Sequence, residues 1–501
     1  MTIIAKTLMV VGTGSDVGKS IVATALCRYF AQKSIAVAPF KAQNMALNSY
    51  VTIDGKEIGR AQGVQAEAAG VVATAEMNPI LLKPSKQYAS QVIVMGKPMK
   101  EMDFKEYRET NHEYIKEVIQ TALQNLREKY ELIVIEGAGS PVEMNLKDRD
   151  IVNMQVAEWA DADVILVADI DRGGVFAQIV GTLALLTDSE RNRVKGIIIN
   201  KFRGDINLFE SGRKWIEDYT GVKVLGVLPY INLPEWEEED SVALNRKNQT
   251  TQNADIDIVV IQYPYLSNYT DFVPLELEED VQVRYVKDIK GFGNPHVVIL
   301  PGTKNTVDDL LYLRESGLEG KILEHVRQQR ELVGICGGYQ MLGKSLLDPY
   351  LIESNHPELK GLDLLSINTV FNPEKKTVRI KGTLINKGTP VFGYEIHMGH
   401  VEWLAEVKPM FKLENGTYDG ARHTTLPVWG TFIHGVFDSD DFRHYWLGEL
   451  RNRYHMAPNE NRISYNQRKE IMFSELASWV KDSMKEEGLQ FITSFYNREC
   501  K

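Results

Sequence analysis

Short apolar runs alternate with helix-like segments along the first half of the chain. These runs cover residues 8–11, 35–38, 132–135, 164–168, 197–199 and 224–228. Strands that alternate with helices form a parallel sheet covered on both faces, so each strand is apolar along its whole length. The pattern therefore predicts an α/β domain with a doubly wound parallel sheet.

The alternation stops between Pro234 and Ala254, where the sequence is first acidic and then polar and rich in amides. Strand-like runs resume at residues 258–261, 297–300 and 332–335. At 501 residues the chain also exceeds what a single hydrophobic core usually organises. We therefore predict a domain over residues 1–235, a linker over 236–254 and a second α/β domain over 255–501.

Composition narrows the classes of function. The formal net charge of −11 argues against non-specific nucleic-acid binding, although local basic residues could still hold phosphates or carboxylates. No apolar run reaches the roughly 18 residues of a membrane helix, and the N-terminus does not resemble a signal peptide, so we expect a cytoplasmic protein with no membrane contact. Cys27, Cys336 and Cys500 are too few and too scattered for a disulfide framework or a metal site, which leaves nucleophilic chemistry.

A glycine-rich loop follows the first predicted strand and precedes an amphipathic helix-like stretch. It contains Gly12, Gly14, Gly18, Lys19 and Ser20. Such a loop turns backbone N–H groups and a helix N-terminus toward phosphate oxygens, while the lysine and the hydroxyl serve the phosphates of ATP and Mg²⁺. The alternative is a glycine-rich turn with a solvated lysine, which the flanking strand and helix disfavour. Five residues separate Gly12 from Gly18, a longer spacing that resembles dethiobiotin synthetase and its relatives, which use ATP to activate a carboxylate.

Carboxylates follow the strand-like run 132–135. Glu136 comes directly after this run, at the end where parallel sheets bind ligands, and is a candidate Mg²⁺ ligand together with Ser20. Glu143, Asp148 and Asp150 lie in the loop that follows. Asp150 is the best candidate among them to orient metal, acyl phosphate or ammonia. The alternative is that all four carboxylates are simply solvated.

A cysteine stands at the end of the strand-like run 332–335. Cys336 is followed by Gly337 and Gly338 and then a helix-like segment, the arrangement of a nucleophile elbow with cysteine in place of serine. The alternative is a small buried core residue. A nucleophilic cysteine needs a base, and His434 ends another apolar run, although the pattern alone also leaves His397 and His400 as candidates.

The segment around Cys336, together with His434, resembles class I glutamine amidotransferases, which share a flavodoxin-like α/β fold. Most of that class place a glutamate two residues after the histidine, where this chain has Val436. The missing glutamate is a feature of the branch that contains the cobyrinic acid and cobyric acid synthases. What orients His434 is then left open.

Six further blocks resemble the cobyric acid synthase family within that branch. They cover residues 38–49, 57–62, 77–84, 169–176, 200–205 and 393–400. Independent blocks in the same order are far harder to meet by chance than one motif. The resemblance implies an N-terminal P-loop NTPase-type sheet and a C-terminal amidotransferase-type sheet.

The resemblance also implies an activity: glutamine- and ATP-dependent amidation of the b, d, e and g carboxylates of adenosylcobyrinic acid a,c-diamide, with Mg²⁺ and release of ADP and phosphate. Cys336 is then the nucleophile, His434 its base, and the N–H groups near Gly302 and Gly337 hold the oxyanion. The alternatives are the related a,c-diamide synthase and a nucleotide-driven switch ATPase with an inactive amidotransferase module. The order of the amidations, the corrin contacts, the oligomeric state and any gating of glutamine hydrolysis stay open.

Overall fold

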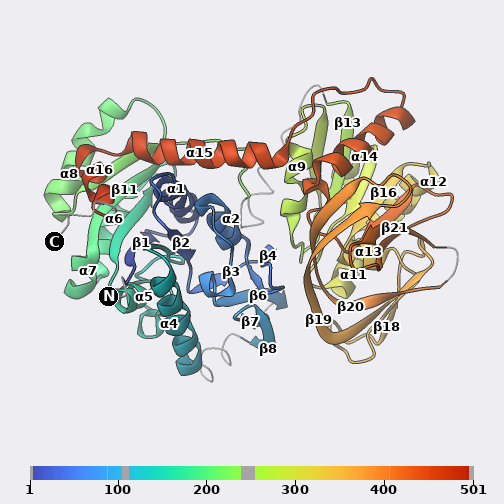
Figure 1. The fold of residues 1–501 in the computed structure, drawn as a ribbon, viewed down its shortest axis with the longest axis horizontal. Coiled ribbons are helices and arrows are strands. Elements are labelled where there is room, and N and C mark those ends of the chain that lie inside the picture. Colours follow the sequence, from blue (N-terminus) through green and yellow to red (C-terminus); the bar gives the residue numbers. More distant parts are fainter. Residues whose placement is uncertain (1–3, 87–88, 104–111, 238–253, 405–406, 496–501) are drawn as a thin grey trace.

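A computed structural model describes residues 4–86, 89–103, 112–237, 254–404 and 407–495 (Figure 1). Most of the predicted linker 236–254, and Cys500, lie outside the described residues. Each half of the chain contributes its own large sheet. The predicted fold class, two α/β units with parallel sheets, is confirmed.

The sheet of the first half has six strands, and every neighbouring pair is parallel. In spatial order the strands are β12 (Val224–Pro229), β11 (Val194–Phe202), β10 (Asp163–Asp169), β1 (Lys6–Gly12), β9 (Leu132–Glu136) and β2 (Val37–Phe40). Their central residues are buried, as expected for strands covered on both faces. We refer to this half as the nucleotide half.

Helices cover both faces of this sheet. Successive side chains of β1 point to opposite faces, so Leu8 and Val10 belong to one apolar core and Met9 and Val11 to another. The first core includes residues of α1 (Lys19–Gln32), α2 (Arg60–Ala69), α15 (Tyr465–Ser483) and α16 (Glu486–Thr493). The second includes residues of α4 (His112–Lys129), α5 (Met154–Ala160), α6 (Val175–Leu185) and α8 (Glu210–Thr220). A short helix, α7 (Asp188–Arg193), leads into β11.

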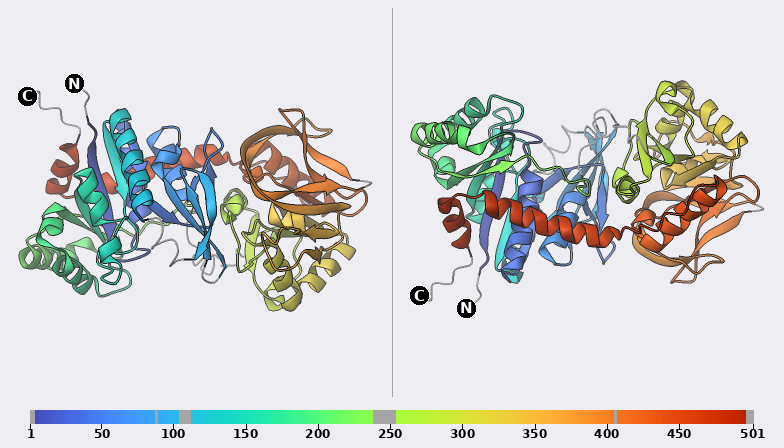
Figure 2. Two further views of the ribbon diagram at one scale, coloured as in Figure 1. Left: turned by 90° about the horizontal axis from the view of Figure 1, so that it is seen from below. Right: turned by 90° about the horizontal axis from the view of Figure 1, so that it is seen from above.

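The end of the chain returns to the nucleotide half. Helix α15 begins beside the second half and runs along the first (Figures 1 and 2). Its residues Met472, Phe473, Leu476 and Val480 are buried in the same core as Leu8 of β1. The last helices thus complete the cover of the first sheet. The domain limits at residues 235 and 255 stay a prediction.

Small sheets extend the nucleotide half toward the second half. One contains β3 (Gln43–Met45), β6 (Ile80–Lys86), β7 (Ala89–Val94) and β8 (Lys97–Asp103). The other is an antiparallel hairpin of β4 (Ser49–Val51) and β5 (Glu57–Gly59). Arg379 donates from Nε to the carbonyl of Val51 at 2.8 Å, so the hairpin touches the second half directly.

The sheet of the second half, which we call the amidotransferase half, has eleven strands. Its parallel part is β14 (Val281–Val286), β13 (Ile256–Ile261), β15 (Val297–Leu300), β16 (Glu331–Ile335) and β23 (Val428–Thr431). The sheet continues through β22 (Tyr418–Arg422), β21 (Lys408–Leu413), β19 (Ile367–Leu384), β17 (Ser345–Leu347) and β18 (Glu358–Lys360), with β20 (Pro390–Trp403) paired to β19. The connecting helices are α9 (Val273–Glu276), α10 (Ile289–Phe292), α11 (Thr306–Glu315), α12 (Leu318–Arg327), α13 (Gly337–Met341) and α14 (Asp440–Arg453).

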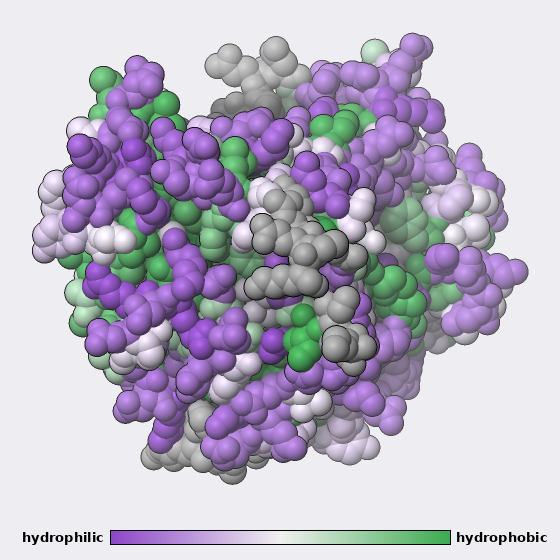
Figure 3. Space-filling model, turned by 60° about the vertical axis from the view of Figure 1, so that its left-hand side comes forward, coloured by the Kyte–Doolittle hydropathy of each residue, from purple (hydrophilic) through white to green (hydrophobic). Residues whose placement is uncertain are grey.

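The face of the molecule drawn in Figure 3 is mainly hydrophilic, with hydrophobic residues in small separate areas. Among the helices of the described residues, none is both long and apolar enough to cross a membrane.

Candidate functional site

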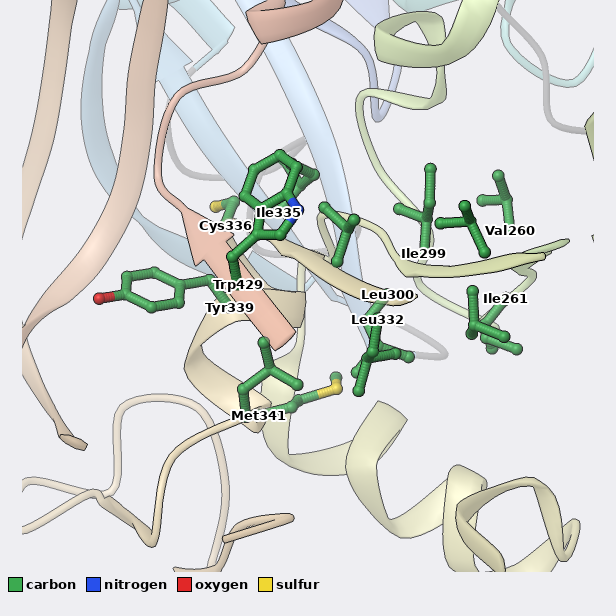
Figure 4. Close-up of a cluster of buried hydrophobic side chains, with 14 of the residues drawn as sticks. Val260, Ile261, Ile299, Leu300, Leu332, Ile335, Cys336, Tyr339, Met341 and Trp429 are labelled. Carbon is green, nitrogen blue, oxygen red and sulfur yellow. The ribbon is translucent and has the colours of Figure 1, made fainter. Parts of the chain in front are cut away.

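Cys336 stands between the parallel strand β16 and helix α13. Its backbone has φ 51° and ψ −110°, a conformation that a residue with a side chain rarely adopts. Such strain is held in place by the surrounding packing and concentrates at functional sites. Figure 4 shows Cys336 beside Ile335 and Trp429 in a buried cluster. The structure therefore has the geometry of the predicted nucleophile elbow.

The residue two positions after Cys336 explains why the elbow needs glycine. A Cβ atom added to Gly338 would lie 1.9 Å from the carbonyl oxygen of Leu300, well inside van der Waals contact. The close approach allows the Gly338 N–H to donate to the carbonyl of Pro301 at 3.1 Å. The turn at Cys336 is thus packed directly against the end of the neighbouring strand β15.

His434 follows strand β23 and is fully buried. Its Nδ1 lies 2.7 Å from Oδ2 of Asp271, and the other oxygen of Asp271 accepts the N–H of Gly435 at 3.0 Å. A carboxylate on Nδ1 fixes the ring and its tautomer and leaves Nε2 to exchange a proton with a nucleophile. Most proteins of this class orient the histidine with a glutamate two residues later, where this chain has Val436. Asp271 is placed to do the same from another segment.

Sequence reasoning missed Asp271. It lies 163 positions before His434, in a one-turn 3₁₀ helix, Tyr269–Phe272. The only signal was an aspartate in a short segment after the strand-like run 258–261. That signal is weak, since aspartate is common where strands end in turns.

The neighbours of His434 raise the pKa of its imidazole. Burial by itself lowers the pKa, because it disfavours the charged ring, but the negative charges of Asp271 and then of Cys336 outweigh burial. The pKa rises to about 10. The site therefore stabilises the charged imidazolium form of His434, the form that results when this ring takes a proton from a nucleophile.

The competing histidines have other partners. His397 bonds through Nδ1 to the carbonyl of Gly399 at 3.0 Å, and its ring stacks on Phe432. His400 is exposed and lies 3.3 Å from the amide of Asn372. This geometry favours His434 as the base.

The two glycines predicted to hold the oxyanion lie close to these residues. A Cβ added to Gly302 would lie 2.7 Å from Cε1 of His434, and one added to Gly337 would lie 2.5 Å from Cγ2 of Thr303. Both backbones thus adjoin the elbow at distances that only glycine tolerates. Their part in binding an oxyanion stays a prediction.

A small cavity of about 30 Å³ adjoins Cys336 and is lined by both halves of the molecule. Lys83 and Gln91 come from the nucleotide half, while Gln340 and Lys375 come from the amidotransferase half. Beneath it, Glu57 of the β4–β5 hairpin forms ion pairs with Lys83 and Lys375. The two halves therefore meet directly beside the nucleophile.

Burial and charge oppose each other in this ion cluster. Burial lowers the pKa of Lys375 to about 8, although the charge of Glu57 opposes the shift. Burial alone would raise the pKa of Glu57, but Lys375 and Lys83 outweigh it and hold that pKa at about 2. Glu57 therefore stays ionised between its two lysines.

The predicted phosphate loop joins β1 to α1 in the nucleotide half. Gly18 has φ 100°, in the region that favours glycine, and precedes the first residue of α1, Lys19. The Nζ atom of Lys19 donates to the carbonyls of Gly14 and Gly139 at 2.7 and 3.0 Å. Its ammonium thus lies over the loop, and Gly12 ends the strand that leads into it.

Glu136 is the last residue of β9 and is buried beneath this loop. Its oxygens accept hydrogen bonds from Ser20 at 2.8 Å, Lys41 at 2.9 Å and Gln65 at 2.6 Å. Burial raises the pKa of Glu136, but Lys41 outweighs it, so the net shift is downward and the carboxylate is ionised. The sequence alternative of an exposed glutamate at the end of a strand is therefore wrong.

The adjacent oxygens of Ser20 and Glu136 suit Mg²⁺, which binds few protein groups and keeps water and phosphate ligands. Among the described residues, no group of three or more His, Cys, Asp or Glu side chains could hold a metal ion. A nucleotide would therefore have to supply part of the coordination. The assignment of Ser20 and Glu136 as ligands stays a prediction.

Asp150 stabilises the local backbone through hydrogen bonds. One of its oxygens accepts the N–H groups of Val152 and Asn153 at 2.9 and 2.8 Å, just before α5 begins. Glu143 and Asp148 are exposed in the same loop. Capping a turn in this way is common for aspartate. The catalytic role of Asp150 stays a prediction, with this bonding as its rival explanation.

Comparisons with known proteins cover nearly the whole chain. The CobQ/CobB/MinD/ParA nucleotide binding domain matches residues 8–244, and the CobB/CobQ-like glutamine amidotransferase domain matches residues 257–442. Cobyric acid synthase of Anoxybacillus flavithermus is 49% identical over 95% of this chain and 94% of its own length. That of Clostridium tetani is 48% identical over 95% and 96%. A solved glutamine amidotransferase is 16% identical over 39% of this chain and 98% of its own length, with a TM-score of 0.31.

Proposed function

The chain belongs to the cobyric acid synthase family, and from this membership and its two sites we propose that it amidates carboxylates of a corrinoid with glutamine and ATP. The substrate is adenosylcobyrinic acid a,c-diamide, whose b, d, e and g carboxylates become amides. ADP, phosphate and glutamate are the other products. The observation that carries this proposal is the buried Asp271–His434–Cys336 arrangement in a chain that also holds a phosphate loop. The cytoplasmic location stays a prediction.

The first step releases ammonia from glutamine. The thiol proton of Cys336 moves to Nε2 of His434, and the thiolate sulfur attacks the amide carbon of glutamine. The C–N bond breaks, Nε2 returns the proton to the leaving nitrogen, and ammonia departs. Water then hydrolyses the thioester to glutamate. Asp271 stabilises the imidazolium during these transfers, and the N–H groups of Gly302 and Gly337 are suited to hold the developing oxyanion.

The second step activates the corrin carboxylate. A carboxylate oxygen attacks the γ-phosphorus of ATP, ADP leaves, and an acyl phosphate forms. Lys19 is positioned to neutralise charge on the phosphates, and Ser20 and Glu136 would hold Mg²⁺, which supplies charge neutralisation when bound. Ammonia attacks the acyl carbon, loses a proton and displaces phosphate, leaving the amide.

Ammonia must travel between the two steps without meeting bulk water, because it is protonated at neutral pH and then no longer nucleophilic. The cavity at Cys336 is lined by residues of both halves, which supports transfer inside the molecule. The path of ammonia would begin at this cavity, which lies beside the β4–β5 hairpin.

The test is to incubate the purified protein with glutamine, ATP, Mg²⁺ and adenosylcobyrinic acid a,c-diamide and to follow the corrinoid by mass spectrometry. Four successive conversions of acid to amide support the proposal. A parallel reaction contains cobyrinic acid as the corrinoid. Its conversion to the a,c-diamide would instead identify the related synthase. ATP turnover without amidation of either corrinoid would contradict both assignments.

A further inference from the structure

The cavity beside Cys336 has a carboxylate on its wall that the chemistry described so far does not use. Glu353 is partly buried there, near Gln340. Its Oε2 accepts the N–H of Thr306, the first residue of α11, at 2.8 Å. Within the described parts of the chain, no other residue donates to this carboxylate. A carboxylate has several acceptor sites, so Glu353 can still accept hydrogen bonds from a ligand in the cavity.

A buried aspartate fixes the backbone at Glu353. Asp348 accepts the N–H groups of Ile352, Glu353 and Ser354 at 2.8, 2.9 and 3.0 Å. Because Asp348 is fully buried, water does not compete for these bonds easily. The turn that carries Glu353 is therefore ordered before a ligand binds, which lowers the entropic cost of binding.

Hydrogen bonds connect Glu353 to the nucleophile by way of α13. The hydroxyl of Thr306 donates to Oε1 of Gln340 at 3.1 Å, and the N–H of Gln340 donates to the carbonyl of Cys336 at 3.0 Å. Gln340 stands four positions after Cys336, a rise of about 6 Å along a helix. In glutamine, two methylene groups separate the amide from the carbon that carries the ammonium and carboxylate groups. A glutamine whose amide lies at Cys336 can therefore extend its charged end toward Glu353.

The charged side chains of the cavity wall form two sets. Lys83 and Lys375 form ion pairs with Glu57. The other carboxylate and ammonium on the wall belong to Glu353 and to Lys304, which lies between β15 and α11. A carboxylate and an ammonium at one cavity match the ammonium and carboxylate of a free amino acid.

The electrostatics at Glu353 are compatible with a cationic ligand. Burial raises the pKa of Glu353 to about 7, although the charge of Lys304 and the bonds from Thr306 oppose the shift. The surrounding protein thus compensates the negative charge only in part, and an ammonium group in the cavity would stabilise the ionised form.

The cavity also has room for such a ligand. Counting all the space between its atoms as far as its open mouth, the cavity measures about 440 Å³, within the range of small-molecule sites. Both polar atoms of the Gln340 amide are bonded inside the protein, Oε1 to Thr306 and Nε2 to the carbonyl of Met398 at 3.2 Å. Gln340 therefore shapes the wall, while Glu353 and Lys304 supply charge.

We propose that Glu353 binds the α-ammonium group of glutamine and that Lys304 binds its α-carboxylate. The pair then selects a free amino acid over a glutamine residue within a peptide, whose α-groups are amides without charge. It also directs the side-chain amide of the substrate to Cys336. This inference rests on the proposed function, because it assumes that Cys336 hydrolyses glutamine.

A merely structural role of Glu353 makes a different prediction. The N-cap of α11 is Asn305, which accepts the N–H of Asp308 at 3.1 Å, so Glu353 adds only one bond to the first turn of the helix. Glu353→Gln keeps a carbonyl oxygen for Thr306 and removes only the negative charge. A structural Glu353 would therefore tolerate this substitution.

The first test measures glutamate formation in the complete reaction mixture for the wild-type protein and Glu353→Gln. The KM for glutamine should rise about tenfold or more in the variant, because a hydrogen bond between two charged groups is lost. The kcat should change little, since this contact is made equally in the ground state and the transition state. An unchanged KM would overturn the assignment of Glu353.

Asp308→Asn is the matched control. It removes a carboxylate charge from the start of the same helix, and Asp308 is not among the residues that line the cavity. The KM for glutamine should keep its wild-type value. An equal rise in Asp308→Asn would mean that charge at the start of α11 controls the KM without contact to the substrate, and it would overturn the proposal.

Two analogues separate a lost contact from a distorted cavity. Glutaramic acid is glutamine without its α-ammonium group, and 4-aminobutanamide is glutamine without its α-carboxylate. Each is measured as a competitive inhibitor of glutamine hydrolysis, so neither needs to be a substrate. Glu353→Gln should weaken inhibition by 4-aminobutanamide and leave that by glutaramic acid unchanged, whereas Lys304→Met should do the reverse. Equal losses for both analogues in either variant would overturn the assignment of that residue.

The two proposals fail in different ways. A wild-type protein that forms glutamate but amidates neither corrinoid contradicts the proposed function and leaves the roles of Glu353 and Lys304 in place. A wild-type protein that amidates the corrinoid, with a KM for glutamine that Glu353→Gln does not change, contradicts only the binding of the α-ammonium group by Glu353.

Discussion

The two reacting centres of this protein are assembled from the chain in different ways. The phosphate loop uses one continuous strand–loop–helix segment, and its lysine bonds the carbonyl of Gly14 only five positions away. The amidotransferase centre joins Asp271, Cys336 and His434 from three separate segments, all of them buried. Local sequence therefore shapes the phosphate loop, to which the distant segment at the end of β9 adds Glu136 and Gly139, whereas long-range packing brings together every member of the second centre.

This difference predicts how each centre responds to change. Lys19 donates to the backbone carbonyls of Gly14 and Gly139, which a bound phosphate can replace as partners. The partner of His434 is a buried carboxylate whose second oxygen is also bonded. Removing a group from the amidotransferase centre leaves buried polar atoms without partners, which is costly.

The largest expected effect is that of Cys336→Ala. Glutamine-dependent amidation should fall by at least about 10³-fold, because the nucleophile of the first step is lost. Amidation with free ammonia should persist, since the second step uses the other half. Corrinoid mass spectrometry with each nitrogen source measures both. Cys27→Ala, which alters a buried cysteine of α1, is the control and should keep glutamine-dependent activity. Loss of the ammonia-dependent reaction in Cys336→Ala would contradict the assignment of glutamine hydrolysis and amidation to separate halves of the molecule.

Asp271→Asn should rank second, with a loss of glutaminase activity of about 10³-fold, because the imidazole loses both its orientation and its counter-charge. The charge of Asp271 raises the pKa of His434, so its removal lowers that pKa and the imidazolium loses its proton earlier. The alkaline limb should therefore move to lower pH. A pH profile of glutamine hydrolysis measures this shift. Asp257→Asn, whose carboxylate pairs with Arg284, should leave the limb in place.

Lys19→Met tests the other centre. Amidation should fall about 10²-fold even with free ammonia, because the substitution removes the ammonium that neutralises charge on the transferring phosphoryl group. Glutamine hydrolysis measured without ATP should stay at the wild-type rate. Rates of phosphate release and of glutamate formation separate the two. The exposed Lys33→Met at the end of α1 serves as control. An unchanged ammonia-dependent rate in Lys19→Met would show that the loop does not bind ATP.

The smallest effect is expected for Asn200→Ala. Its Nδ2 donates to the carbonyl of Val17 at 2.9 Å and so supports the phosphate loop from outside. A hydrogen bond of this kind contributes about 1 kcal/mol, so the KM for ATP should rise about fivefold. Steady-state kinetics at varied ATP measure the change, with the exposed Asn192→Ala as control. A change in the KM for glutamine without one for ATP would place Asn200 outside the nucleotide centre.

The sequence alone determined the features that depend on residues close together along the chain. Continuous apolar runs indicated both parallel sheets, because a strand covered on both faces needs apolar residues on both sides. The glycines at Gly18 and Gly338 marked the loop and the elbow, since each stands where a side chain would be strained or would clash. These signals lie within a few residues of the groups they position.

Only the tertiary structure decided which distant groups meet. Nothing near His434 in the sequence identified Asp271, because the contact arises from packing of segments 163 positions apart. The return of α15 to the first sheet and the contact of Asn268 with Ser49 have the same origin. The physical reason is that periodicity and turn chemistry act along the chain, whereas the pairing of buried polar groups is settled by how the two halves pack together.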